Sequence, residues 1–231
     1  MSDKWKLVVE KLLTKAEDGA TTQAERESLI SKATELMAKF GIEEQMLDFS
    51  HGIKNTPNRT SYDIQNPYGN LKKIMLNQLS ISFGCVAVDA RDFEVFGFAD
   101  DLDRVRYLYN SLLVQLFVAM SKTEVPAGYN SKAFRNSFAK GFISTVTKRV
   151  QESVERAKQS FEDKNKMSLV LRTKYESVIK AMMTEFPNTT TVTKKVHVST
   201  RAGLMAGRAA GTMADIGQTR ITGGKREISG R

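Results

Sequence analysis

Residues 84–105 have the sequence GCVAVDARDFEVFGFADDLDRV, and this stretch decides the fold class of the chain. Two short runs, 85–88 and 93–96, are rich in valine and phenylalanine, which favour strands. The polar residues Asp89–Asp92 between them are typical of a tight turn. The pattern therefore predicts a β-hairpin that leads directly into a helix.

That helix is predicted over residues 101–120, with Asp100 as its N-cap. Apolar residues recur at helical spacing along most of its length, so we expect a central helix with the hairpin packed on it. They are Leu102, Val105, Leu108, Leu112, Leu116 and Ala119, widened by Tyr109, Leu113, Phe117 and Met120.

The same periodicity predicts further elements on both sides of this unit. Helices are expected over 69–82, 130–163, 167–185 and 200–216, and the alternating residues 190–198 predict one C-terminal strand. In the helix over 130–163, apolar residues recur every four positions from Phe134 to Val154. A period of four drifts by roughly 40° per step on a 3.6-residue helix, so this helix either touches several neighbours or is broken midway.

The last helix carries glycine at positions 203, 207 and 211, which places the three on one stripe. Glycine inside a helix costs about 1 kcal/mol, so the stripe needs a physical reason. Close packing against another backbone is the reason we favour, and contact with a phosphate backbone is the alternative.

The N-terminal 48 residues predict two helices joined by a tight turn. The first covers residues 5–16, and the second begins at Thr22–Glu25, which fits a capping box, and ends before Gly41. Turn-forming residues fill the next stretch. The predicted organisation is a helical hairpin over 1–48, a linker over 49–67, an α+β core domain over 68–216 and a basic tail over 217–231. The fold class is α+β and mainly helical.

Charge is distributed unevenly along the chain, whose formal net charge is +9. The first 48 residues have 7 basic and 10 acidic side chains, whereas residues 121–180 have 13 and 6, and residues 194–231 have 8 and 2. A basic surface of this kind suits a polyanion, because each neutralised phosphate releases counterions. A solvated helix face with surplus lysine is the alternative.

The predicted phosphate-contacting residues lie on the long helix, on the last helix and in the tail. They are Lys132, Arg135, Lys148, Arg149, Arg201, Arg208, Lys225 and Arg226.

Motifs for most catalytic chemistry are missing from the sequence. The single cysteine, Cys85, excludes a disulfide within one chain and a cysteine-based zinc site, and its apolar neighbours predict a buried thiol. The Gly-Gly-Lys at 223–225 lacks the first glycine and the hydroxyl residue of a P-loop. No cofactor is predicted, and the sequence favours a non-enzymatic protein.

Asp100, Asp101 and Asp103 form an acidic cluster that we consider as an alternative metal site. Capping and complementation of the helix dipole explain the same acids without a metal.

The N-terminus lacks a secretory pattern and no apolar run has the length of a membrane span, so we expect a cytoplasmic protein that does not insert into membranes.

Three stretches at the N-terminus, 9–17, 24–27 and 33–42, resemble the family catalogued as domain of unknown function 2786, which occurs in bacteria and bacteriophages. The ending Glu35-Leu-Met-Ala-Lys-Phe-Gly-Ile42 matches the family pattern closely, whereas the middle departs from it. A weaker similarity continues at residues 96–101 and 206–215. The resemblance implies a bacteriophage origin and supplies no activity.

Together these features predict a non-enzymatic, bacteriophage-encoded protein that binds the phosphate backbone of DNA or RNA through its basic second half. The alternative is a module that binds a host or phage protein through the N-terminal helical hairpin. A metal-dependent enzyme that uses the three aspartates is a third hypothesis.

Overall fold

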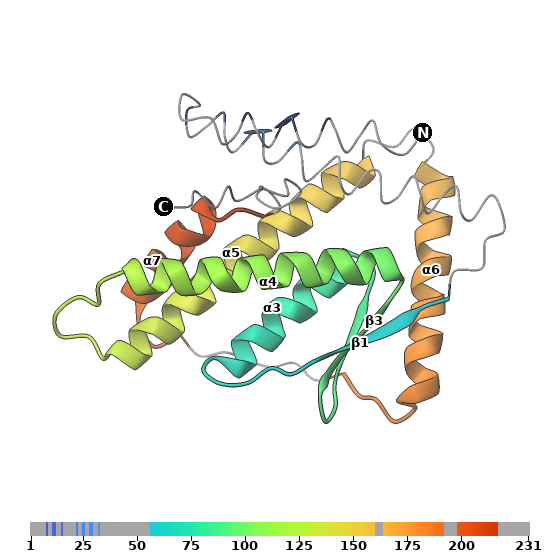
Figure 1. Ribbon diagram of the computed structural model, residues 1–231, viewed down its shortest axis with the longest axis horizontal. Helices are drawn as coiled ribbons and strands as arrows, with labels where there is room; N and C mark the ends of the chain where they lie inside the picture. Colours follow the sequence, from blue (N-terminus) through green and yellow to red (C-terminus); the bar gives the residue numbers. More distant parts are fainter. Residues whose placement is uncertain are drawn as a thin grey trace, which may run out of the picture.

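The computed structural model describes residues 56–159, 164–191 and 198–216, together with scattered residues between Val8 and Lys32. Over these residues the protein is mainly helical with one small antiparallel sheet, as the α+β prediction requires (Figure 1). The elements are β1 (Asn58–Tyr62), α3 (Gly69–Ser82), β2 (Val86–Asp89), β3 (Phe93–Gly97), α4 (Ala99–Lys122), α5 (Ser131–Gln159), α6 (Lys164–Glu185) and α7 (Arg201–Met213).

The sheet has three strands in the order β1-β3-β2, and both pairs are antiparallel. The predicted hairpin is confirmed, since β2 and β3 pair across the turn that the sequence indicated. Every residue of the central strand β3 is buried. The sheet therefore needs cover on both of its faces.

Strand β1 was not predicted, because it lies in the stretch 49–67 that we expected to be a linker. Its residues Asn-Arg-Thr-Ser-Tyr are mostly polar and alternate between exposed and half-buried positions. An edge strand of this kind has no apolar alternation, so only its pairing with β3 identifies it.

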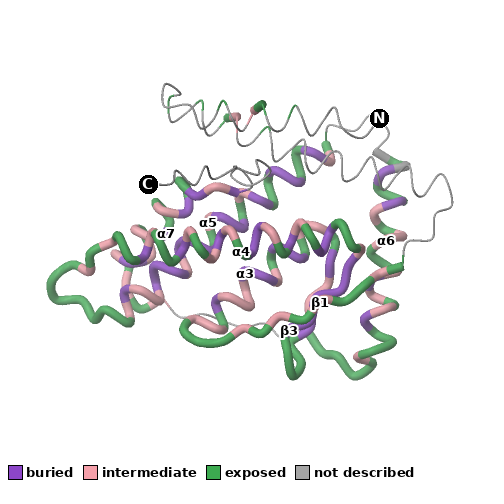
Figure 2. The backbone as a smooth tube through the Cα atoms, viewed as in Figure 1, coloured by how far each residue is buried: buried purple, intermediate pink, exposed green. Residues whose placement is uncertain are grey.

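Two hydrophobic cores cover the two faces of the sheet. Figure 2 marks the buried stretches of the helices and strands. Phe93 and Val95 belong to the large core. Helices α3, α4 and α5 form most of this core, and α7 and the residues just after it pack against it. Phe96 belongs to a smaller core on the other face, where Val178 and Met182 of α6 cover the sheet. The sheet therefore lies between two helical layers, with α3, α4 and α5 on one face and α6 on the other.

Helix α4 begins at Ala99 with Phe98 as its N-cap, so the prediction that Asp100 caps it is wrong. No side chain accepts a hydrogen bond at this cap. The ring of Phe98 packs instead against the smaller core, and Asp100 and Asp101 lie in the first helical turn, where they complement the helix dipole. The helix thus begins one residue after a half-buried aromatic ring rather than after an acidic cap.

The glycine stripe of α7 packs directly against α5, which confirms the packing prediction. A Cβ atom added at Gly203, Gly207 or Gly211 would lie 2.9 Å or less from the carbonyl oxygen of Phe134, Phe138 or Phe142, respectively. The residue numbers of the glycines and of their contacts on α5 increase in the same direction, so α5 and α7 run parallel. The four-residue repeat of α5 thus matches the four-residue repeat of α7, and α5 also contacts α3, α4 and α6 without a break.

Three predicted segments lie partly or wholly outside the described residues: the N-terminal hairpin, most of the strand over 190–198, and the tail over 217–231. Within the first of them, the capping box is confirmed. The backbone N–H of Thr22 donates to Glu25 at 3.0 Å, and that of Glu25 donates weakly to the Thr22 hydroxyl at 3.4 Å. Leu29 packs against the large core.

Candidate functional site

A cavity of about 680 Å³ opens where the C-terminal ends of α3 and α5 meet the start of α4 and the first half of α6. Its lining is mainly apolar, with charged side chains at several points. Its lining includes Ile81, Asp101, Arg104, Ser168, Leu171 and Lys174.

A buried ionic cluster forms one wall of this cavity. Asp101, whose side chain is 7% exposed, accepts hydrogen bonds from Arg104 Nη1 at 2.8 Å and from Lys174 Nζ at 3.0 Å. The ammonium group of Lys174 also lies 4.3 Å from the centre of the Phe98 ring. One carboxylate thus serves two cations, which leaves an excess of positive charge at the cavity wall.

Burial lowers the pKa of Lys174, because desolvation penalises its charged form, and the neighbouring carboxylate of Asp101 opposes that effect. The charged form of Lys174 therefore depends on the neighbouring carboxylate of Asp101.

The acidic cluster that we considered as a metal site does not converge. Asp101 points to Arg104 and Lys174, whereas Asp103 lies exposed and pairs with Arg106 at 2.6 Å. Within the described ranges no three histidine, cysteine, aspartate or glutamate side chains gather closely enough to hold a metal ion. Among the residues that the structure describes, the three aspartates thus do not form a metal site.

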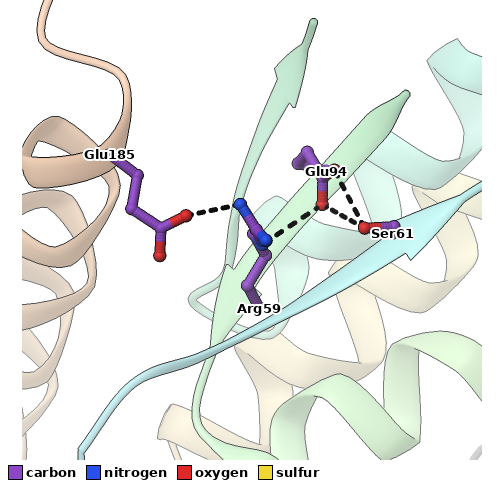
Figure 3. Close-up of polar contacts among 4 residues, drawn as sticks. All are labelled: Arg59, Ser61, Glu94 and Glu185. Carbon is purple, nitrogen blue, oxygen red and sulfur yellow. Dashed lines mark hydrogen bonds and ion pairs between the residues drawn. The ribbon is translucent and has the colours of Figure 1, made fainter. Parts of the chain in front are cut away.

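A second buried carboxylate, Glu94, joins the sheet to α6 (Figure 3). The hydroxyl of Ser61 on β1 lies 2.7 and 2.8 Å from its two oxygens, and Arg59 Nε lies 3.7 Å away. Arg59 also pairs with Glu185 at the end of α6. These polar groups satisfy one another and hold three elements together, so we assign them a structural role.

The single thiol is buried, as the sequence predicts. Cys85 is 0% exposed, and burial raises its pKa well above the ordinary range, with the negative charge of Asp101 adding to the effect. A thiol in this state is a poor nucleophile.

Two of the predicted phosphate-contacting residues are engaged inside the fold. Arg149 donates from Nη1 to the carbonyl oxygens of Gly211 and Ala214, both at 2.7 Å, and so caps the end of α7. Arg135 donates to the carbonyl oxygen of Met120 at 3.2 Å, near the end of α4. Their positive charges serve helix C-terminal ends, where cations are stabilised.

The remaining predicted residues divide into two groups. Lys132, Lys148, Arg201 and Arg208 are exposed, and Lys148 lies 3.6 Å from Glu152. Lys225 and Arg226 lie outside the described residues. The structure thus brings Lys132 and Arg201 to the same end of the α5–α7 pair, and it leaves Lys148 farther along α5.

Sequence reasoning missed the pairing of Lys174 with Asp101, although it noticed the aspartate. The two residues are 73 positions apart, and Lys174 is one basic residue among many on its helix. Only the packing of α6 beside the start of α4 distinguishes it.

No helix in the described part of the chain has both the length and the apolar character needed to cross a membrane.

Comparison with known families gives one match. Residues 9–44 match the model of a family described as "Protein of unknown function (DUF2786)", which confirms the resemblance to that family at the N-terminus. The match ends before the weaker similarities at 96–101 and 206–215, which remain predictions. No curated protein and no solved structure matches the chain.

Proposed function

We propose that this protein binds the phosphate backbone of nucleic acid through exposed basic residues of the α5–α7 pair. The observation that carries the proposal is the parallel packing of these two helices. Gly203 lies against Phe134, and the exposed residues Arg201 and Lys132 each precede that contact by two positions. Both cations therefore lie at the same end of the pair.

Arg208 extends this basic surface along α7. It lies seven residues after Arg201, which is almost two full turns, so both side chains leave the same side of the helix. The glycine stripe of the same helix faces α5, whereas the side chains of Arg201 and Arg208 are exposed.

The local electrostatics favour an anion at this place. Helix α7 contains no acidic residue, and neither α5 nor α7 has one in its first turn. Both helix N-termini carry partial positive charge and lie together because the helices are parallel. Lys132 and Arg201 add full charges to it.

Arg135 and Arg149 donate to carbonyl oxygens at helix ends, so we leave them out of the residues proposed to contact phosphate. We infer that Lys132, Arg201 and Arg208 make the principal phosphate contacts, with Lys148 and the tail residues Lys225 and Arg226 as additional ones. This surface has no feature that distinguishes bases, so we propose binding without sequence specificity.

Fluorescence anisotropy with labelled single-stranded DNA, duplex DNA and RNA over a salt series tests the proposal. We expect affinity to fall linearly with salt on a logarithmic plot. In an Arg201→Gln/Arg208→Gln variant the slope should decrease by about two units on duplex DNA, because two phosphate contacts are lost.

An Arg91→Gln/Arg106→Gln variant is the matched control. It removes the same charge from the hairpin turn and from α4, away from the α5–α7 pair, and its slope should equal that of the unmodified protein. No binding to any of the three nucleic acids at low salt would overturn the proposal, as would equal slopes for both variants.

The resemblance at residues 9–44 supports a proposal about the origin of the protein. We infer a bacteriophage-encoded protein that acts in the bacterial cytoplasm. The alternative function is binding of a host or phage protein through the N-terminal helical hairpin, whose net charge is −3 from 7 basic and 10 acidic residues. Capture of a specific partner that survives nuclease treatment would favour this alternative.

A further inference from the structure

We propose that the 680 Å³ cavity between α3, α4, α5 and α6 binds a small amphipathic anion, a molecule with an apolar body and one anionic head group. This inference goes beyond nucleic-acid binding and concerns a different place in the fold. Lys132 and Lys158 lie on α5 near its two ends, 26 residues and therefore about 39 Å apart. Lys158 borders the cavity, whereas Lys132 belongs to the basic surface described above.

The apolar side chains of the cavity account for the body of the ligand. Ile81 at the end of α3 is 62% exposed, and Tyr175 on α6 is 44% exposed, and both line the cavity. Val154 of α5 and Leu171 of α6 add to the apolar lining. Apolar surface held in a concave site gains free energy when a ligand removes it from water.

The ionic cluster accounts for the sign of the head group. Of the residues that the structure describes, four basic and two acidic side chains line the cavity, and Asp101 pairs with both Arg104 and Lys174. Lys158 and Arg172 pair with glutamates at the surface, Glu155 and Glu176. The excess positive charge therefore lies at Arg104 and Lys174, beside the apolar lining.

Arg104 is the residue best placed to bind the head group. A guanidinium has five N–H donors, and among the described residues Arg104 donates from Nη1 to Asp101. Donors remain for a carboxylate or a phosphate, which a guanidinium can bind in a bidentate manner. The volume of the cavity lies within the range of about 300–1,000 Å³ that is usual for small-molecule sites.

Fluorescence of 8-anilinonaphthalene-1-sulfonate, an amphipathic anion, tests the proposal on the full-length protein. We expect saturable binding with one site per chain. Decanoate and decyl phosphate should displace the probe, and whichever does so at lower concentration identifies the preferred head group. Decylammonium, which has the same body and the opposite charge, should displace it at least about tenfold less well, and acetate should not displace it.

Arg104→Gln should weaken decanoate binding by about tenfold or more, since a hydrogen bond to a charged group is lost. Arg106→Gln is its matched control, because Arg106 has the same i,i+3 pairing with an aspartate and lies outside the cavity. Ser168→Trp should fill the cavity from an exposed position, and Leu169→Trp, one residue along and outside the cavity, should leave binding unchanged.

Equal displacement by decanoate and decylammonium would overturn the role of charge, and unchanged binding in the Ser168→Trp variant would overturn the location. Displacement by adenosine monophosphate without displacement by decanoate would contradict the apolar body of the ligand. None of these outcomes depends on whether the α5–α7 pair binds nucleic acid.

Discussion

Gly97 at the end of β3 faces the thiol of Cys85, and a Cβ atom at position 97 would lie 2.4 Å from that sulfur. The contact explains why a glycine stands at the end of the central strand. It also encloses the thiol, whose pKa rises because water is excluded. Burial of this one atom has a consequence for the stability of the whole protein at alkaline pH.

We predict that Cys85 makes the protein less stable as the pH rises above 9. The unfolded thiol loses its proton near its ordinary pKa of 9.0, whereas the folded thiol keeps it. The folded state then binds more protons than the unfolded state, so the free energy of unfolding falls by up to about 1.4 kcal/mol per pH unit. Urea denaturation under reducing conditions at pH 8, 9.5 and 10.5 measures this fall.

A Cys85→Ala variant provides the comparison, since the difference between the two proteins isolates the thiol. Burial raises the pKa of Tyr62 to about 12, which adds destabilisation above pH 10 in both proteins. The pKa of Lys174 is lowered, so below pH 10.5 this residue makes the free energy of unfolding rise with pH. This effect is also present in both proteins. Equal pH dependence of the two proteins would show that the thiol is not protected.

At the scale of elements, the α5–α7 contact shows how two sequence repeats become one interface. The phenylalanines of α5 recur every four residues, as do the glycines of α7. The backbone carbonyl of Phe138 lies where a side chain at position 207 would begin, 1.9 Å from an added Cβ atom. The sequence indicated close packing of the glycine stripe, but it did not indicate the partner.

Gly207→Ala should therefore destabilise the protein by about 3 kcal/mol, because the helices have to move apart. The intrinsic helix propensity of alanine acts in the opposite direction by about 1 kcal/mol, so a net loss of stability identifies the steric contact. Thermal and urea denaturation measure the change.

Ala209→Ser is the control, since it enlarges an exposed residue of the same helix and should change stability by about 0.5 kcal/mol or less. An alanine at 207 that leaves stability unchanged or raises it would contradict the parallel packing on which the proposed basic surface depends.

At the scale of the whole molecule, Glu94 joins segments that are far apart in the sequence. Ser61 on β1 donates to it, and Arg59 pairs both with it and with Glu185, which follows Arg59 by 126 residues. Glu94 itself is 7% exposed, so these partners replace the water that its polar atoms have lost. The network holds the edge strand β1 beside β3, and it holds the C-terminal end of α6 against the sheet.

We predict that Ser61→Ala destabilises the protein by about 2 kcal/mol, because a buried carboxylate loses a hydrogen bond. The loss should be smaller when Glu94 is already alanine, and a double-mutant cycle in urea measures the difference. Ser82→Ala removes an exposed hydroxyl that bonds within α3 and should have little effect. Additive effects of Ser61→Ala and Glu94→Ala would contradict the coupling.

The sequence by itself determined the elements whose signal is local. The hairpin at 85–97, the helix over 69–82 and the long helices follow from short-range periodicity, which reflects burial of one face. Short stretches of sequence also predicted the capping box at Thr22, the burial of Cys85 and the family resemblance at residues 9–44.

Only the tertiary structure decided which residues meet across the chain. Strand β1 is polar and gains its identity from β3, whereas Phe98, whose half-buried ring packs against the smaller core, is the N-cap of α4 in place of Asp100. Basic residues look alike in a sequence, yet Arg149 caps a helix, Lys174 neutralises Asp101 and Arg201 lies exposed. Contacts between residues tens of positions apart set these roles, and such contacts exist only once the helices have packed.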